Sequence, residues 1–114
     1  MAKADRLEAL DLRRAEMEVE YKDALLAALR DTAAGKWGLF DHNQDRVTRA
    51  KIAPVVDNLT DLGESIDAAR EKLGLEPFAL HHEFLASRGK VSSHAVGEPK
   101  QARAWLDRLE AATG

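Results

Sequence analysis

Three oxygen-bearing side chains at alternate positions are the strongest candidates in this sequence for binding chemistry. Asp41, Asn43 and Asp45 take the first, third and fifth positions of a calcium-binding loop, which draws ligands from those positions. Such a loop also needs a glycine at its sixth position and a bidentate glutamate at its twelfth, where this chain has Arg46 and Ile52. We therefore expect one of the three side chains to cap the next helix by accepting hydrogen bonds from its free amides.

The histidines are candidates for metal binding or acid–base chemistry. His81 and His82 are adjacent, so they point to different sides of a helix and cannot chelate one ion as an i, i+4 pair would. His81 falls within the apolar arc of its segment, which predicts a hydrogen-bonded, partly buried histidine, whereas His82 is predicted at the surface. No spacing implies a nucleophile with its base, so the sequence favours a non-enzymatic protein with no catalytic residue and no cofactor. A small-molecule or metal-binding site stays an alternative, with His81, His42, Asp41 and Asp45 as its candidate residues.

Two aromatic residues, Trp37 and Phe40, lie beside Gly35 and Gly38 in the stretch 35–45. Aromatic side chains on a glycine-hinged corner can anchor a partner protein, because such residues carry much of the energy of interfaces. They can equally fold back and fill the end of a helical bundle, because large rings supply much of a small core. We expect the rings to point inward, and partner binding stays the alternative.

The corner joins two long helical patterns. Residues from about 4 to 34 contain no Gly or Pro and are rich in strong helix formers. Leu7, Leu10 and Met17 open an apolar stripe at three-four spacing, and Gly35 is a suitable left-handed cap at the end. At about 1.5 Å per residue this helix spans roughly 45 Å, which is longer than a compact domain of this size can cover. Its first turns therefore project into solvent or pair with another chain.

The rest of the chain predicts three further helices. The second runs over about 46–73, with a kink or restart expected at Pro54 and a stop at Gly74. The third runs from Pro77 to about 87, a loop follows over 88–98, and the last helix covers about 99–112. No segment alternates like a strand. The prediction is an all-α, single-domain bundle over 1–114, with a long N-terminal helix, a Pro-kinked second long helix and two shorter C-terminal helices.

Composition narrows the class of protein. The chain has 114 residues, a net charge of −3 and no cysteine, which excludes disulfides and thiolate metal sites and fits a cytoplasmic location. No segment approaches the roughly 18 consecutive apolar residues that a membrane span needs, and no signal peptide is expected. Weak nucleic-acid binding is a minor option, through the cluster Lys36, Arg46, Arg49 and Lys51.

The segment Ala33–Phe40, with the helical residues Leu25–Arg30 before it, resembles small bacterial helical proteins of unknown function. The resemblance covers residues 25–40 and implies no activity, ligand or residue role. Because the first helix is longer than the domain can cover, we expect the protein to function in protein–protein interaction, as a homodimer or with another protein. The partner-binding candidates are Trp37, Phe40, Leu7, Leu10 and Met17.

Overall fold

The computed structural model describes residues 2–36, 38–40, 45–88 and 97–113. Over those ranges the protein is a small all-α bundle with no strand, as the sequence predicts. Its helices are α1 (Ala2–Ala33), α2 (Arg46–Lys72), α3 (Ala79–Ser87) and α4 (Gly97–Thr113). Within the described ranges, no helix is both long enough and apolar enough to cross a membrane.

Glycine ends both long helices in the way the sequence predicts. Gly35 and Gly74 adopt positive φ angles of 77° and 71°, a left-handed conformation that costs glycine little. The amide of Lys36 then donates to the carbonyl oxygen of Asp31, and the amide of Leu75 donates to that of Arg70. These bonds satisfy carbonyl groups that a helix end otherwise leaves free.

Helix α2 begins with a capped turn and continues through a proline. Both carboxylate oxygens of Asp45 accept hydrogen bonds from Thr48, one from its amide at 2.9 Å and one from its hydroxyl at 3.1 Å. The predicted helix cap is therefore confirmed at Asp45. Pro54 lies inside an uninterrupted helix, so the predicted restart there is wrong, and a bend at Pro54 stays a prediction.

Helix α3 begins two residues later than the sequence suggests. Pro77 is not helical, Phe78 is extended, and the helix starts at Ala79. The amide of Phe78 donates to a carboxylate oxygen of Asp67 at 2.8 Å, a contact with α2 that holds the chain out of helical geometry. A tertiary hydrogen bond thus outweighs the preference of proline for the first turn.

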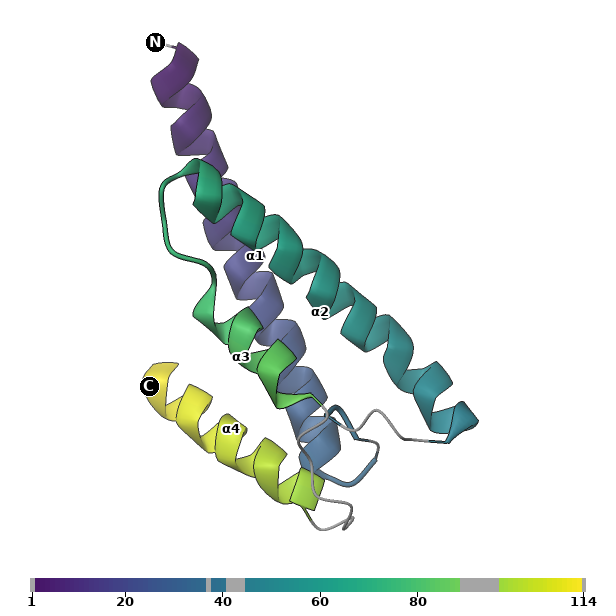
Figure 1. Ribbon diagram of the computed structural model, residues 1–114. Coiled ribbons are helices and arrows are strands. Elements are labelled where there is room, and N and C mark those ends of the chain that lie inside the picture. Colours follow the sequence, from purple (N-terminus) through teal and green to yellow (C-terminus); the bar gives the residue numbers. More distant parts are fainter. Residues whose placement is uncertain (1, 37, 41–44, 89–96, 114) are drawn as a thin grey trace.

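Helix α1 is the spine of the bundle (Figure 1). It packs against α2 on one side and α4 on another, while α3 packs against α2. The lower half of α1 in the figure therefore lies in the core, together with residues of all other helices and of the corner. The buried apolar residues include Tyr21, Leu25, Leu29, Leu39, Phe40, Leu59, Ile66, Phe84, Trp105 and Leu106.

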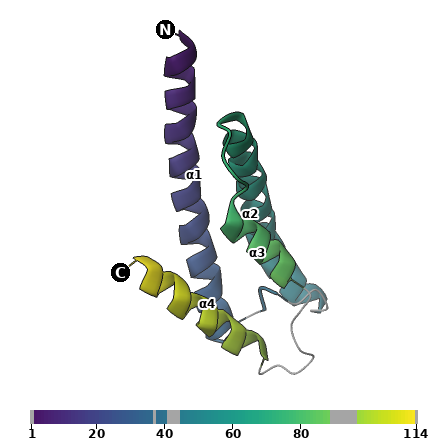
Figure 2. The ribbon, with the colours of Figure 1, turned by 60° about the vertical axis from the view of Figure 1, so that its left-hand side comes forward.

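The first turns of α1 project beyond the other helices in both views (Figures 1 and 2). Residues 5–9 are all exposed, and the first fully buried side chain of the helix is that of Met17. The molecule measures 56 × 32 × 18 Å, and its radius of gyration is 15.9 Å. A compact domain of this length has a radius of about 13 Å, so the projecting helix dominates the shape.

Candidate functional site

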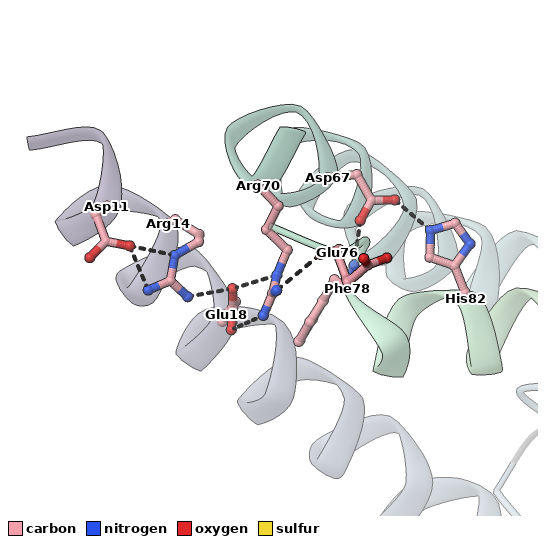
Figure 3. A network of polar contacts seen from close by, with 8 residues as sticks. All are labelled: Asp11, Arg14, Glu18, Asp67, Arg70, Glu76, Phe78 and His82. Carbon is pink, nitrogen blue, oxygen red and sulfur yellow. Dashed lines mark hydrogen bonds and ion pairs between the residues drawn. The ribbon is translucent and has the colours of Figure 1, made fainter. Parts of the chain in front are cut away.

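A shared carboxylate joins α1 to the end of α2 (Figure 3). The Nε of Arg70 donates to Glu18 at 3.0 Å, and its Nη1 donates to the carbonyl oxygen of Glu76 at 3.0 Å. Glu18 also accepts from Arg14 at 2.7 Å, and Arg14 donates to Asp11 at 2.8 Å. Two arginines from different helices therefore hold one glutamate, which fixes the end of α2 against α1.

A second carboxylate positions the start of α3. One oxygen of Asp67 accepts from the amide of Phe78, and the other lies 2.6 Å from the Nε2 of His82 (Figure 3). The ring of Phe78 meets that of Tyr21 edge-on, with centroids 5.3 Å apart, and the guanidinium of Arg70 lies over its face. These contacts place His81, which follows Phe78 by three residues, inside the bundle.

His81 is enclosed between α1 and α2, with 2% of its surface exposed. Its Nδ1 lies 2.9 Å from the hydroxyl of Tyr21. On the other side its ring lies so close to Gly63 that a Cβ there would stand 2.3 Å from the imidazole. The prediction of a buried, hydrogen-bonded histidine is therefore confirmed, whereas the requirement for glycine at position 63 was not predicted.

Burial sets the protonation of this pair. It raises the pKa of the Tyr21 phenol, with a further contribution from the charge of Asp67, so the hydroxyl is protonated when it shares a hydrogen bond with Nδ1 of His81. Burial also lowers the pKa of the imidazole; the carboxylates of Asp67 and Glu64 oppose this shift, and His82 adds to it. The lowered pKa favours the neutral imidazole at neutral pH.

The predicted ligand residues do not form a common site in the described ranges. The carboxylate of Asp45 caps α2, and His81 is enclosed and bonded to Tyr21. Asp41 and His42 lie outside the described residues. Among the residues that the structure does describe, no group of three or more His, Asp or Glu side chains could hold a metal ion.

The corner residue Phe40 is fully buried, as the inward-pointing alternative predicts. Its ring lies 5.9 Å from that of Trp105 on α4. The guanidinium of Arg88, from the end of α3, donates to the carbonyl oxygen of the neighbouring Leu39. Phe40 is therefore a core residue and not a partner anchor, because no part of its ring reaches solvent. Trp37, the other candidate, lies outside the described residues.

The three partner candidates on α1 differ in how deeply they are buried. Met17 is buried in the core and Leu10 is partly buried against it, so neither is free to meet a partner. Leu7 is 42% exposed. Two apolar residues on another face of α1, Leu12 and Val19, are 63% and 60% exposed and were not among the predicted contacts. Their spacing of seven residues was the signal that could have identified them.

These two side chains belong to a longer exposed surface, which we call the α1 stripe. At 3.6 residues per turn its members span an arc of roughly 80° on the helix. All are exposed: Asp5, Glu8, Leu12, Ala15, Val19 and Asp23. The three acidic residues make no hydrogen bond or ion pair with any described residue. The stripe is therefore apolar at its centre and acidic at its ends.

A second surface lies on the first half of α2, which we call the α2 face. Its residues Val47, Lys51, Pro54 and Asn58 recur at helical spacing and are all exposed, Val47 by 66%. Pro54 and Asn58 also line an open cavity of about 360 Å³ between α1 and α2, with a floor of Ala24, Ala27 and Ala28 and with Asp31 and Val55 at its sides.

The charge of this region is uniformly basic. Arg46, Arg49 and Lys51 occur in the stretch 46–56, which contains no acidic residue. All three are exposed, and none makes an ion pair within the described part of the chain. The fourth member of the predicted basic cluster, Lys36, instead pairs with Asp31 at 3.4 Å. The α2 face thus combines the apolar Val47 and Pro54 with basic residues at the start of α2, and Asp57 and Asp61 follow at its other end.

The α1 stripe and the α2 face are the principal unpartnered surfaces in the described part of the molecule, and each could contact a macromolecule. Comparison of the chain with protein-family models, curated proteins and solved structures finds no match.

Proposed function

We propose that this protein is a non-enzymatic interaction module that forms a homodimer through the N-terminal half of α1. The observation that carries the proposal is the α1 stripe, where the side chains of Leu12 and Val19 are more than half exposed. Single exposed apolar residues are ordinary at protein surfaces. Two on one face, about 10.5 Å apart along one helix, favour a helix-packing surface.

The apolar area of this contact limits the affinity of the dimer. Complete burial of a leucine or valine side chain gives about 1.5–3 kcal/mol. Two such residues from each of two chains would give roughly 6–12 kcal/mol, which is comparable with the roughly 4–15 kcal/mol cost of association. The proposal is therefore a moderate dimer that needs further contacts from the second chain. A cytoplasmic location belongs to the same proposal and is supported by the absence of cysteine.

Sedimentation equilibrium tests the dimer. The wild-type chain is expected to self-associate at tens of micromolar, where a dimer of this strength is populated. The double variant Leu12→Gln/Val19→Gln should be monomeric, because glutamine keeps the helix and removes the apolar contact. Leu85→Gln is the matched control, since Leu85 is an exposed leucine on α3 away from the stripe. It should associate like the wild type, and circular dichroism should give the same helix content for all three chains.

A strictly monomeric wild-type chain over that concentration range would overturn the proposal. Equal association of the wild type and the stripe variant would contradict the assignment of the contact to α1.

A small-molecule site is the alternative, and it is supported by the cavity between α1 and α2, whose volume lies in the range of ligand pockets. A panel of metabolites and divalent metals that raises the melting temperature of a monomeric chain would favour it. Loss of that shift in Asp31→Asn would place the ligand in the cavity.

A further inference from the structure

The α1 stripe and the α2 face are complementary in chemistry. The stripe presents Leu12 and Val19 with unpaired Asp5, Glu8 and Asp23. The α2 face presents Val47, Lys51 and Pro54, with Arg46 beside its start, next to a cavity lined by alanines. Neither Arg46 nor Lys51 has an ion pair within the described part of the chain. Both surfaces have exposed apolar residues, and the acidic ends of the α1 stripe are opposite in charge to the basic start of the α2 face, whose other end is followed by Asp57 and Asp61.

Two copies of the α1 stripe do not complement one another. In such a contact the acidic residues of one stripe would face those of the other. Like charges repel strongly when an interface removes the water around them. Lys22 lies beside the stripe and makes no ion pair with any described residue, but one lysine cannot balance three carboxylates on each side. A second copy must therefore meet the stripe with a different, basic surface.

We infer that the α1 stripe of one chain docks on the α2 face of a second copy, with Arg46 and Lys51 meeting the acidic residues of the stripe. This inference rests on the proposed homodimer and names the surface that receives α1. The small side chains of Ala24, Ala27 and Ala28 leave the space beside α2 in which the side chains of an incoming helix can pack.

The positions of the two surfaces determine the symmetry of the dimer. The stripe lies towards one end of the 56 Å molecule, and the start of α2 lies at the other end (Figure 1). Two chains side by side in opposite directions place each stripe on the α2 face of the other. The same contact then forms twice around a twofold axis and closes the assembly as a dimer.

Charge reversal tests the inference separately from the proposed function. Arg46→Glu/Lys51→Glu is expected to weaken the dimer by about tenfold or more, because it places acidic residues against an acidic stripe. The control Lys100→Glu/Arg103→Glu changes the net charge equally on exposed residues of α4 and should leave the dissociation constant unchanged. Adding Asp5→Lys/Glu8→Lys to the α2 variant restores opposite charges in both contacts and should recover the dimer.

Mixing supplies an independent readout. Leu12→Gln/Val19→Gln and Arg46→Glu/Lys51→Glu each lose both contacts as homodimers. A heterodimer of the two retains one intact contact, formed by the stripe of the α2 variant and the α2 face of the stripe variant. Sedimentation of the mixture should therefore show a dimer that neither variant forms alone.

The outcomes separate the two proposals. If the stripe variant is monomeric while Arg46→Glu/Lys51→Glu dimerises like the wild type, the homodimer stands and the receiving surface is wrong. If the wild-type chain is monomeric, both fail. Assemblies that grow beyond a dimer with concentration would overturn the twofold arrangement. If a labelled single-stranded oligonucleotide binds the wild-type chain and not the α2 variant, while that variant still dimerises, the basic residues serve nucleic acid and the inference is overturned.

Discussion

Gly63 is the residue on which the position of α3 depends most directly. The ring of His81 occupies the space that a side chain at position 63 would need, at 2.3 Å from an added Cβ. Alanine improves the helix propensity of α2 by about 1 kcal/mol relative to glycine, so its effect on an open helix face would be stabilising. Here the steric cost outweighs that gain, because the ring is held against position 63 by its hydrogen bond to Tyr21 on the other side.

We therefore expect Gly63→Ala to lower the free energy of unfolding by about 2 kcal/mol, the typical cost of overpacking a core. Chemical denaturation measures this directly. In a His81→Ala background the clash is absent, and the same substitution should be neutral or stabilising. An equal loss in both backgrounds would show that the imidazole is not the obstacle.

A neutral buried histidine also makes stability depend on pH. Burial lowers the pKa of His81 in the folded protein, so below the ordinary value of about 6.5 the unfolded chain takes up a proton that the folded one does not. Stability is then present above that pH and is lost as the pH falls below it. Asp67 and Glu64 reduce the effect, and His82 increases it.

Urea denaturation at pH 7.5 and pH 5.5 checks this expectation. The wild-type chain should lose stability over that interval, and His81→Gln should lose less because glutamine does not titrate. Glutamine can still accept the hydrogen bond of Tyr21. Equal losses for the two chains would assign the pH dependence to the other titratable groups.

Among the elements, α2 and α3 depend on the contacts of Arg70. Its guanidinium reaches Glu18 on α1, the carbonyl oxygen of Glu76 beyond α2, and the ring of Phe78. The side chains of Arg70 and Glu18 are both about four-fifths buried, so water screens this pair less than a surface pair. Arg70→Met keeps the aliphatic packing and removes the charge.

This variant is expected to be less stable by about 1–3 kcal/mol, the cost of removing one partner of a charged hydrogen bond. Asp11→Asn offers a control in the same network, since Asp11 is largely exposed and its ion pair contributes little. Thermal unfolding should place the melting temperature of Arg70→Met well below that of the control. Indistinguishable melting temperatures would show that Arg70 does not clamp the helices.

The same contacts explain how far the sequence predicts the elements. The glycines at 35 and 74 and the cap at Asp45 act through neighbouring backbone, so local patterns identify them. The start of α3 depends on Asp67, eleven residues before Phe78, and no local pattern contains that hydrogen bond. The burial of Phe40 was predictable from its size, but its contact with Trp105 joins residues 65 positions apart.

The candidate surfaces were harder to predict for a related reason. The apolar residues of α1 include both those that pack in the core and those of the α1 stripe. The sequence alone does not show which turns of α1 are covered by α2 and α4. Met17 and Leu10 therefore appeared equivalent to Leu7, although the fold buries Met17 and leaves Leu7 42% exposed. Which apolar residues are free follows from the lengths and packing of the other helices.

At the scale of the whole molecule, the first turns of α1 affect the shape of the protein more than its stability. Residues 5–9 are exposed, so they contribute little to the core, yet they extend the long axis of a molecule with a radius of gyration of 15.9 Å. The same segment carries Asp5 and Glu8 of the α1 stripe. A chain that begins at Leu10 keeps Leu10 and Met17 in place against the core.

We expect this truncated chain to unfold within about 0.5 kcal/mol of the full chain when both are monomeric, because the removed side chains lie at the surface. Small-angle scattering at low concentration should give a smaller radius of gyration, and sedimentation should show weaker association. Removing residues 110–114 instead is the control at the opposite terminus, since it leaves both surfaces intact and should not change the dimer. A large loss of stability on truncation at Leu10 would mean that the first turns of α1 support the fold. They would then not be a free docking surface.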